Sequence, residues 1–514
     1  MAPAVPSDPV VLAIDQGTTN TKAMLVRGDG QIMLSRPRSV PLAFPQSGWV
    51  EQSAEDIWTT VVDLIAELCA AAPRASIAAL AISNQRETVL LWDRHTGKPL
   101  APAVTWQCRR SADRCAALRA DGHEEEIASL SGLGIDPLFP AAKISWMLDH
   151  IPDARTAAAR GDILAGTIDS WLLWKLTGGT VHATDTSNAS RTQLFNLDRL
   201  TWDERLAELF DIPLSILPQV MPSDSLFGTV QDACPALPDG TPVRAMMGDS
   251  HAALFAHDED ASGTVKVTIG TGSSLMVATP ARARSTHGLS GTVAWSRSDG
   301  GAQYALEGNI SVSGHAASFM AKMMGLAGAA ALSELAGQVD SSDGVIVVPA
   351  LAGLGAPHWQ TDARGTITGM TLGTMPAHLA RATLEGIAHQ ICDVIEAMEA
   401  DLGQDFPAIA IDGGGSESAL LAQMLADFSG KTIISPASAE TSALGAARMA
   451  ALATGIAIGG QDRQETRYHP ALSINYRKEA RNLWRAAIAR LIAAQAGPAA
   501  APTTAGNSMA ASAA

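Results

Sequence analysis

The chain has 514 residues, 47% of them hydrophobic and 17% charged, which is too long for one hydrophobic core but enough apolar material for two. Its 36 lysines and arginines against 52 aspartates and glutamates give a net charge of −16 without any dense basic run, which argues against a nucleic-acid partner. The five cysteines are scattered and lack CxxC spacing, which predicts neither disulfides nor a zinc site. The sequence shows no signal pattern and no long apolar run, so we expect a cytoplasmic protein without membrane spans.

Both ends of the chain, residues 1–8 and 497–514, are rich in Ala, Pro, Ser and Thr. Such segments bury too little apolar surface to order themselves, so we expect both to be disordered. Between them we expect a first domain over residues 9–257 and a second over residues 258–496. The boundary is expected near His257 to Ser262, a polar stretch ahead of a β-branched run.

The first predicted element is a β-hairpin with a glycine-containing turn. Val10 to Ile14 and Ala23 to Val26 are apolar runs, and Asp15 to Thr19 read DQGTT between them. Such a turn offers close backbone approach, two threonine hydroxyls and a carboxylate, which together can hold a polyphosphate and its Mg²⁺. Taken alone, the same string is more often an ordinary turn.

Later segments indicate α/β structure in both halves. Residues 54–72 follow Ser53 with acids in the first turn, and residues 376–400 have apolar residues at helical spacing, so both are predicted helices. A second hairpin is predicted over residues 265–278, where GTGSS joins two apolar runs, and a third glycine-rich turn follows the apolar run 408–411. The recurrence suggests duplicated domains with a nucleotide cleft between them, although a match this short can arise by chance.

Several segments carry a more specific resemblance. They are, in chain order, residues 84–88 (NQRET), 106–110 (WQCRR), 166–172 (GTIDSWL), 184–192 (TDTSNASRT), 353–359 (GLGAPHW) and a signature over 365–385, with a less perfect signature around Lys143, Trp146 and Asp149. With these motifs the chain resembles the FGGY carbohydrate kinase family and its glycerol kinase branch, from about Val10 to about Arg485.

This resemblance implies two actin-like, ribonuclease H-like domains with ATP and a small polyol meeting in the cleft between them. It places Asp249 as the general base and, with Asp15, as a Mg²⁺ ligand. It implies acceptor binding by Arg86, Glu87, Trp106, Leu138, Asp249, Ser250 and Ser274. It implies nucleotide binding by Thr18, Thr19, Asn20, Lys22, Thr271, Gly314, Ser318, Gly414 and Ser418.

The chain departs from the family pattern in the expected acceptor pocket. Glycerol kinases usually carry Tyr, Gln and Phe where this sequence has Leu138, Ser250 and Ser274, and all three changes remove bulk. An emptied pocket discriminates less, and His251 is expected to offer a new polar contact to a longer substrate. The alternative to a widened pocket is that neighbouring side chains fill the vacated space. Ser318 and Ser418 replace the usual Gln and Asn beside the nucleotide.

Three functions remain open on the sequence. The first is ATP-dependent phosphorylation of glycerol, and the second is the same reaction on a four- or five-carbon polyol or ketose. The third is a non-catalytic nucleotide-binding protein of actin-like fold. This third function is disfavoured because the chain retains the expected site residues Asp15, Arg86, Glu87 and Asp249. The expected partners are ATP, Mg²⁺ and a small polyol, and a homo-oligomer is left open.

Overall fold

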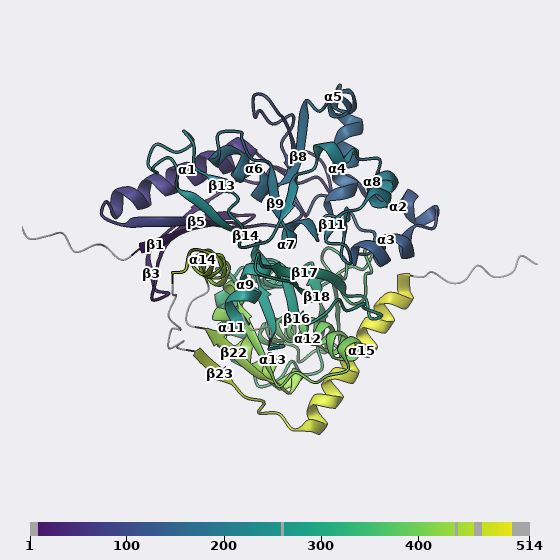
Figure 1. Ribbon diagram of the computed structural model, residues 1–514. Coiled ribbons are helices and arrows are strands. Elements are labelled where there is room, and N and C mark those ends of the chain that lie inside the picture. The colour runs from purple at the N-terminus through teal and green to yellow at the C-terminus, as the bar shows by residue number, and fades with distance from the viewer. Residues whose placement is uncertain (1–8, 259–261, 437–439, 457–464, 496–514) are drawn as a thin grey trace, which may run out of the picture.

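The computed structural model describes residues 9–258, 262–436, 440–456 and 465–495. Two α/β halves, each built on one large mixed sheet, make up the chain (Figure 1). The disorder expected for residues 1–8 and 497–514 falls outside the described residues, as does part of the expected domain boundary. No helix within those ranges combines the length and the apolarity needed to cross a bilayer.

The sheet of the first half begins with the predicted hairpin. β1 (Pro9–Gln16) pairs antiparallel with β2 (Asn20–Arg27), and β5 (Ser76–Asn84) and then β14 (Pro242–Gly248) continue the sheet in parallel. β3 (Ile32–Ser39) and β13 (Gly228–Thr229) form its edges. The predicted helix is α1 (Ala54–Ala71), which is capped by Ser53 through a bond from Asp56 N.

The sheet of the second half repeats this order. β15 (Val265–Ile269) and β16 (Ser273–Thr279) form the second predicted hairpin, with β18 (Ala302–Ile310) antiparallel on one side. β21 (Ala408–Asp412) and β22 (Thr432–Pro436) follow in parallel on the other side. The order β18-β16-β15-β21-β22 thus matches β3-β2-β1-β5-β14, including every strand direction, which supports the expected duplication. β17 (Ser290–Ser296) and β23 (Glu465–Tyr468) extend the second sheet.

The remaining elements surround these sheets. In the first half they are β4 (Glu51–Gln52), β6 (Val89–Asp93), β7 (Ala103–Val104), α2 (Ala112–Ala120), α3 (Glu124–Ser131), α4 (Pro140–His150), α5 (Ala154–Arg160), β8 (Ile163–Thr167), α6 (Ile168–Leu176), β9 (Ala183–Asp185), α7 (Thr186–Ala189), β10 (Phe195–Asn196), β11 (Thr201–Trp202), α8 (Glu204–Phe210) and β12 (Gln219–Met221). In the second half they are α10 (Gly314–Met323), α11 (Ala329–Ala336), β19 (Ile346–Val348), β20 (Thr366–Thr368), α12 (Pro376–Leu402), α13 (Ala419–Ser429) and α15 (Ile474–Gln495). α12 is the second predicted helix and ends two residues later than expected.

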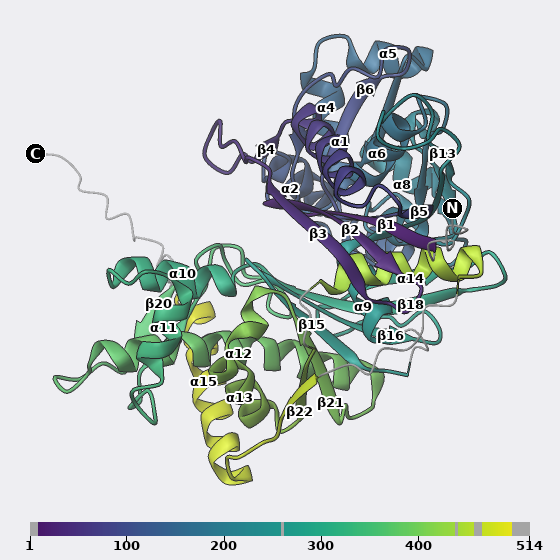
Figure 2. The ribbon, with the colours of Figure 1, turned by 90° about the vertical axis from the view of Figure 1, so that its left-hand side faces the viewer.

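Two helices lie between the halves. α9 (Asp249–His257) leaves the first sheet, and α14 (Thr441–Thr454), from the second half of the sequence, packs on β1, β5 and β14 of the first sheet (Figure 2). Their close approach requires a small residue, because a methyl group on Gly445 would overlap the Ala252 carbonyl. The two halves are therefore joined by packing as well as by the chain.

Candidate active site

Three parallel strands of the first sheet end at one edge and bring polar side chains there. Asp15 of β1 is in register with Ser83 of β5, and Ser83 is in register with Met247 of β14. Asp249 follows two residues later as the first residue of α9. Ligands of α/β sheets bind at the carboxyl ends of parallel strands. The fold thus places the predicted base and metal ligand at the edge where a substrate would lie.

Asp15 lies in a partly buried and negatively charged environment. Ser83 Oγ donates a 2.8 Å hydrogen bond to Asp15 Oδ1. Burial has the largest effect on the pKa of Asp15, which is raised to about 7. The carboxylates of Asp249 and Glu440 also raise it, while the Ser83 hydrogen bond and the Lys22 charge lower it. A proton or a cation would relieve this excess of negative charge.

Asp249 is partly accessible and lies beside Arg86. Arg86 Nε is 3.2 Å from Asp249 Oδ1, and Ser250 N donates to the same oxygen at 2.6 Å. About a third of the Asp249 side chain, 35%, stays exposed. Desolvation raises the pKa of Asp249, Arg86 opposes this shift and Glu87 reinforces it. A carboxylate that is accessible and has a raised pKa is suited to accept a proton from a hydroxyl.

Arg86 is held by a carboxylate that the sequence did not single out, Glu307 of β18. Arg86 Nη1 and Nη2 each lie 2.8 Å from one oxygen of Glu307, whose side chain is fully buried. Burial disfavours the charged guanidinium, but Glu307, Glu87 and Asp249 outweigh it and raise the pKa of Arg86. β18 was not predicted from the sequence, where the only signal was an acid directly after the apolar residues Ala305 and Leu306. Lys266 of β15 is likewise a buried charged residue within a strand.

Glu87 follows Arg86 in a left-handed backbone conformation, with φ of 60°. Its side chain is buried and accepts a 2.7 Å hydrogen bond from Arg191 Nε. Its carbonyl accepts a 2.9 Å bond from Lys143 Nζ, and Lys143 also bonds the Leu138 carbonyl. Burial lowers the pKa of Lys143 to about 7, against the raising effect of Glu87. Lys143, from the weaker family signature, thus fixes the backbone of two predicted acceptor residues.

The other predicted acceptor residues gather around this cluster. Trp106 Nε1 donates to Thr18 Oγ1 at 2.8 Å, which links the indole to the first hairpin turn. Ser274 Oγ donates to Glu307 Oε1 at 2.9 Å, so its proton is already engaged. Leu138 is half-buried and Ser250 is buried. Of the three residues that remove bulk from the expected pocket, Ser274 is therefore tied to Glu307.

The expected contact of His251 with a substrate is wrong. His251 is fully buried, and its Nε2 lies 3.1 Å from Thr292 Oγ1. Burial lowers the pKa of His251 well below its usual value. Because α9 already begins at Asp249, a residue two positions further along points to the opposite face of the helix.

The predicted nucleotide residues of the second half lie around the second hairpin. The Thr271 carbonyl accepts bonds from Ser313 N and His315 N, and a Cβ on Gly314 would lie 2.5 Å from the Gly270 carbonyl oxygen. The third glycine-rich turn packs on Ile269, and Gly414 in that turn has open space beside it.

Two serines complete this side of the site. Ser318 is exposed in the second turn of α10, and its Oγ donates to the Gly314 carbonyl at 3.2 Å. Ser418 caps α13, and its Oγ lies 2.9 Å from Ser333 Oγ of α11.

The first hairpin turn presents Thr19 and Asn20 to solvent. Lys22, two residues into β2, instead lies 2.7 Å from Glu440, immediately before α14. This ion pair joins the two halves beside Asp15, and its members contribute to the pKa of Asp15 with opposite signs. A phosphate at the turn would compete with Glu440 for Lys22.

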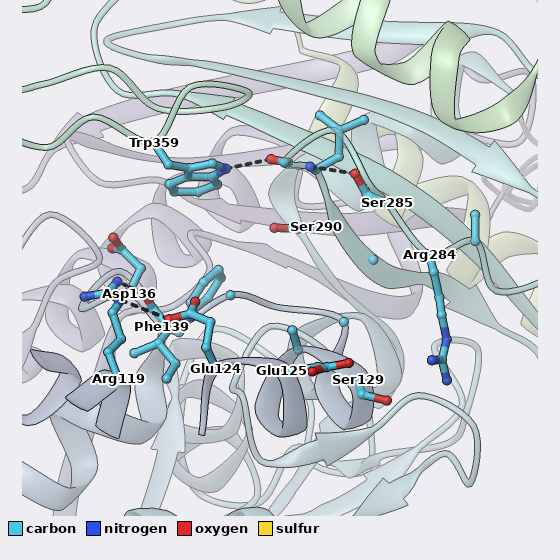
Figure 3. A pocket seen from close by; sticks show the side chains of 18 of the residues that line it. Arg119, Glu124, Glu125, Ser129, Asp136, Phe139, Arg284, Ser285, Ser290 and Trp359 are labelled. Carbon is cyan, nitrogen blue, oxygen red and sulfur yellow. Dashed lines mark hydrogen bonds and ion pairs between the residues drawn. The ribbon is translucent and has the colours of Figure 1, made fainter. Parts of the chain in front are cut away.

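A separate cavity of about 600 Å³ lies between the halves (Figure 3). Trp359 and Ser290 of the second half lie across it from Asp136 and Phe139 of the first half. None of the residues predicted to bind acceptor or nucleotide lines it. The ring of Phe139 is 5.1 Å from the guanidinium of Arg191, which bonds Glu87. Phe139 thus separates this cavity from the Arg191–Glu87 pair.

Asp15 and Asp249 are better suited to a Mg²⁺ ion that is also bound by substrate phosphates than to a metal ion held by protein side chains alone. Among the described residues, no three His, Cys, Asp or Glu side chains are placed to hold an ion together. Asp15 and Asp249 are close enough for the charge of one to raise the pKa of the other. Mg²⁺ in proteins is commonly bound by one or two carboxylates together with substrate phosphates and water.

Comparisons with known proteins agree with this geometry. Models of the N-terminal and C-terminal domains of the FGGY family of carbohydrate kinases match residues 10–256 and 265–454. Glycerol kinase of Koribacter versatilis is 41% identical over 94% of this chain and 98% of its own, and glycerol kinase of Chromobacterium violaceum is 44% identical over 91% and 95%. The crystal structure of Plasmodium falciparum glycerol kinase with ADP matches with a TM-score of 0.86 and 30% identity, over 95% of this chain and 99% of that one. The two domain models match one after the other along most of the chain, in agreement with the two duplicated sheets. The chain therefore belongs to the FGGY family of carbohydrate kinases.

Proposed function

We propose that this kinase transfers the γ-phosphoryl group of ATP to a terminal hydroxyl of glycerol, giving glycerol 3-phosphate and ADP. The observation that carries the proposal is the Asp249 carboxylate, which is partly exposed at the carboxyl end of β14 and lies 3.2 Å from Arg86 Nε. The glycerol kinases that resemble nearly the whole chain support glycerol as the acceptor.

In the proposed reaction, Asp249 accepts the proton of the acceptor hydroxyl while the bond from that oxygen to the γ-phosphorus forms and the bond to the ADP oxygen breaks. Phosphoryl transfer depends mainly on positioning and on stabilisation of charge, which a fixed carboxylate and a fixed guanidinium both provide. Arg86 and Glu87 would bind the other two hydroxyls, Trp106 would flank the carbon chain, and Leu138 would close the pocket.

For the nucleotide, we propose that the two hairpin turns hold the phosphates and that the second half holds the nucleoside. The proposed contacts are Thr18, Thr19, Asn20, Lys22, Thr271, Gly314, Ser318, Gly414 and Ser418. Asp15 and Asp249 would hold Mg²⁺, which when bound neutralises phosphate charge. The proposed compartment is the cytoplasm, where the five cysteines, all unpaired thiols, would stay reduced.

A second candidate substrate is a four- or five-carbon polyol or ketose. Leu138, Ser250 and Ser274 leave the acceptor pocket with short side chains, and the Ser274 hydroxyl keeps free lone pairs after donating to Glu307. A substrate with one or two more carbons could use that space and those acceptors.

Steady-state ADP release with glycerol, dihydroxyacetone, erythritol, threitol, xylulose and ribulose tests both candidates. The proposal expects ATP-dependent turnover with glycerol and, for the wider pocket, a comparable kcat/KM for at least one longer acceptor. Absence of turnover with every one of these acceptors would refute the proposed function. Strict selectivity for glycerol would refute only the wider pocket.

A further inference from the structure

One buried carboxylate of the second half, Glu307, is linked to two of the predicted acceptor-binding side chains of the first half, to Arg86 directly and to Glu87 through Arg191. Glu307 Oε2 lies 2.8 Å from Arg86 Nη1 and 2.9 Å from Arg191 Nη1, and Arg191 Nε in turn donates to Glu87 Oε1 at 2.7 Å. Glu307 Oε1 accepts from Arg86 Nη2 at 2.8 Å and from Ser274 Oγ at 2.9 Å.

We propose that Glu307 is an interdomain positioning residue, which orients Arg86 directly and Glu87 through Arg191 so that they can bind the acceptor next to Asp249. The proposal rests on the acceptor-binding role proposed above for Arg86 and Glu87. It adds that this site is complete only while the second half holds Glu307 against the first.

The geometry around Arg86 supports a positioning role. Glu307 takes the outer edge of the guanidinium, one oxygen to each terminal nitrogen, which fixes the plane of the group. In that arrangement Asp249 Oδ1 lies 3.2 Å from Arg86 Nε as an ion pair. Each terminal nitrogen has a second N–H, so the held guanidinium can still donate to a substrate hydroxyl.

The electrostatics explain why this carboxylate stays charged. Burial alone would raise the pKa of Glu307, but the charges of Arg191 and Arg86 hold it well below its usual value. The acceptor cluster therefore contains alternating charges across the domain interface, from Glu87 through Arg191, Glu307 and Arg86 to Asp249. Moving Glu307 away would leave two buried guanidinium groups without their shared partner.

A buried ion pair can also serve stability alone, so the test needs a matched control. Asp393 of α12 is a buried carboxylate in the same half, bound by Arg481 Nη2 at 2.6 Å, Trp484 Nε1 at 2.8 Å and His358 Nε2 at 3.0 Å. Glu307→Gln and Asp393→Asn each remove one buried negative charge that faces an arginine. Only the first change reaches the acceptor cluster.

The experiment compares full-length wild type, Glu307→Gln and Asp393→Asn by steady-state kinetics with glycerol and ATP varied separately. Displacing a positioning group by about 1 Å can cost about 100-fold, so kcat/KM for glycerol should fall about 100-fold in Glu307→Gln while the KM for ATP changes less than about threefold. Asp393→Asn should lower the melting temperature with glycerol kcat/KM nearly unchanged. Equal kinetic losses in both variants, or normal glycerol kinetics in Glu307→Gln, would overturn the proposal.

A double-mutant cycle with Arg86→Lys tests whether Glu307 acts through Arg86. The loss from Glu307→Gln should shrink to less than about threefold in the Arg86→Lys background, because coupled residues are not additive. Full additivity would contradict the proposal. If Glu307→Gln does not fold, Ser274→Ala removes one of the hydrogen bonds to Glu307 and should lower glycerol kcat/KM by about three- to tenfold, with no effect on the KM for ATP.

Hydrogen exchange separates failure of this inference from failure of the proposed function. Exchange of the backbone amides in residues 84–88 should speed up in Glu307→Gln, or in Ser274→Ala if only that variant folds, but not in Asp393→Asn. Faster exchange in an enzyme that phosphorylates none of the tested polyols would keep the positioning role and refute the assigned substrate. Unchanged exchange would refute the positioning role itself.

Discussion

The exchange of Asp249 for asparagine tests the catalytic role most directly. The amide side chain would keep the size of the carboxylate and an oxygen for the Ser250 amide, which now donates to Oδ1 at 2.6 Å. It would lose the negative charge and the ability to take up the proton of the acceptor hydroxyl. A positioned base contributes about 10²- to 10⁴-fold to rate, so kcat should fall by about that factor.

The stability cost of Asp249→Asn should be small. Arg86 would retain both contacts with Glu307, and the pair that is lost involves a carboxylate that is 35% exposed and therefore screened by solvent. Such pairs contribute about 1 kcal/mol or less, which corresponds to at most a few degrees of melting temperature. Protein yield, melting temperature and ATP binding should thus remain close to those of the wild type.

A matched control separates loss of charge from loss of catalysis. Asp162 is 37% exposed, close to the 35% of Asp249, and lies 2.6 Å from Arg160 Nε, so Asp162→Asn removes the charge of a similarly exposed carboxylate outside the acceptor cluster. Coupled ADP release with glycerol should show normal kcat for Asp162→Asn and a loss of at least about 100-fold for Asp249→Asn. An Asp249→Asn enzyme within about threefold of the wild-type kcat would refute the role of Asp249 as the base.

Three further changes test other parts of the site. The triple variant Leu138→Tyr, Ser250→Gln, Ser274→Phe should narrow the enzyme toward glycerol, lowering kcat/KM for longer acceptors by about tenfold or more relative to glycerol in the same assay; an unchanged acceptor profile would contradict the wide pocket. Asp15 has a pKa raised from 3.8 to about 7 by folding, so its contribution to the free energy of unfolding is lost as pH rises from about 4 to about 7. The melting temperature of Asp15→Asn relative to the wild type should therefore increase over that range and then level off, and a constant difference would argue against the raised pKa. His251→Ala should lower the melting temperature, because it leaves a cavity and leaves the Thr292 hydroxyl with Ser190 as its remaining side-chain partner, without shifting the ranking of acceptors; an altered ranking would place His251 in the pocket after all.

Local chemistry made much of the fold predictable. The two hairpins, the three glycine-rich turns and the two helices depend on residues that are neighbours in the sequence, and all have the predicted positions. Turn residues and capping residues act within a few positions, so one sequence is enough to identify them.

The candidate site was only partly predictable because its polar contacts join distant segments. Glu307 lies in the middle of a strand, and nothing near it in sequence indicates that Arg86, 221 positions earlier, is its partner. His251 shows the opposite error, since closeness to Asp249 in sequence suggested closeness to the substrate. Only the start of α9 at Asp249 reveals that the two side chains leave the helix in different directions.

The position of α14 has a consequence for synthesis of the chain. Ala13, Ala81 and Ala245 of the first sheet pack in the same buried cluster as Ala446 and Ala450 of α14. A ribosome makes the first sheet several hundred residues before this helix emerges, so that apolar face of the sheet stays uncovered for most of translation. Nascent chains that stop before Thr441 should therefore resist proteases less well in their first half than the finished protein does. The first half of the sequence completes its fold only when nearly the whole chain has been made.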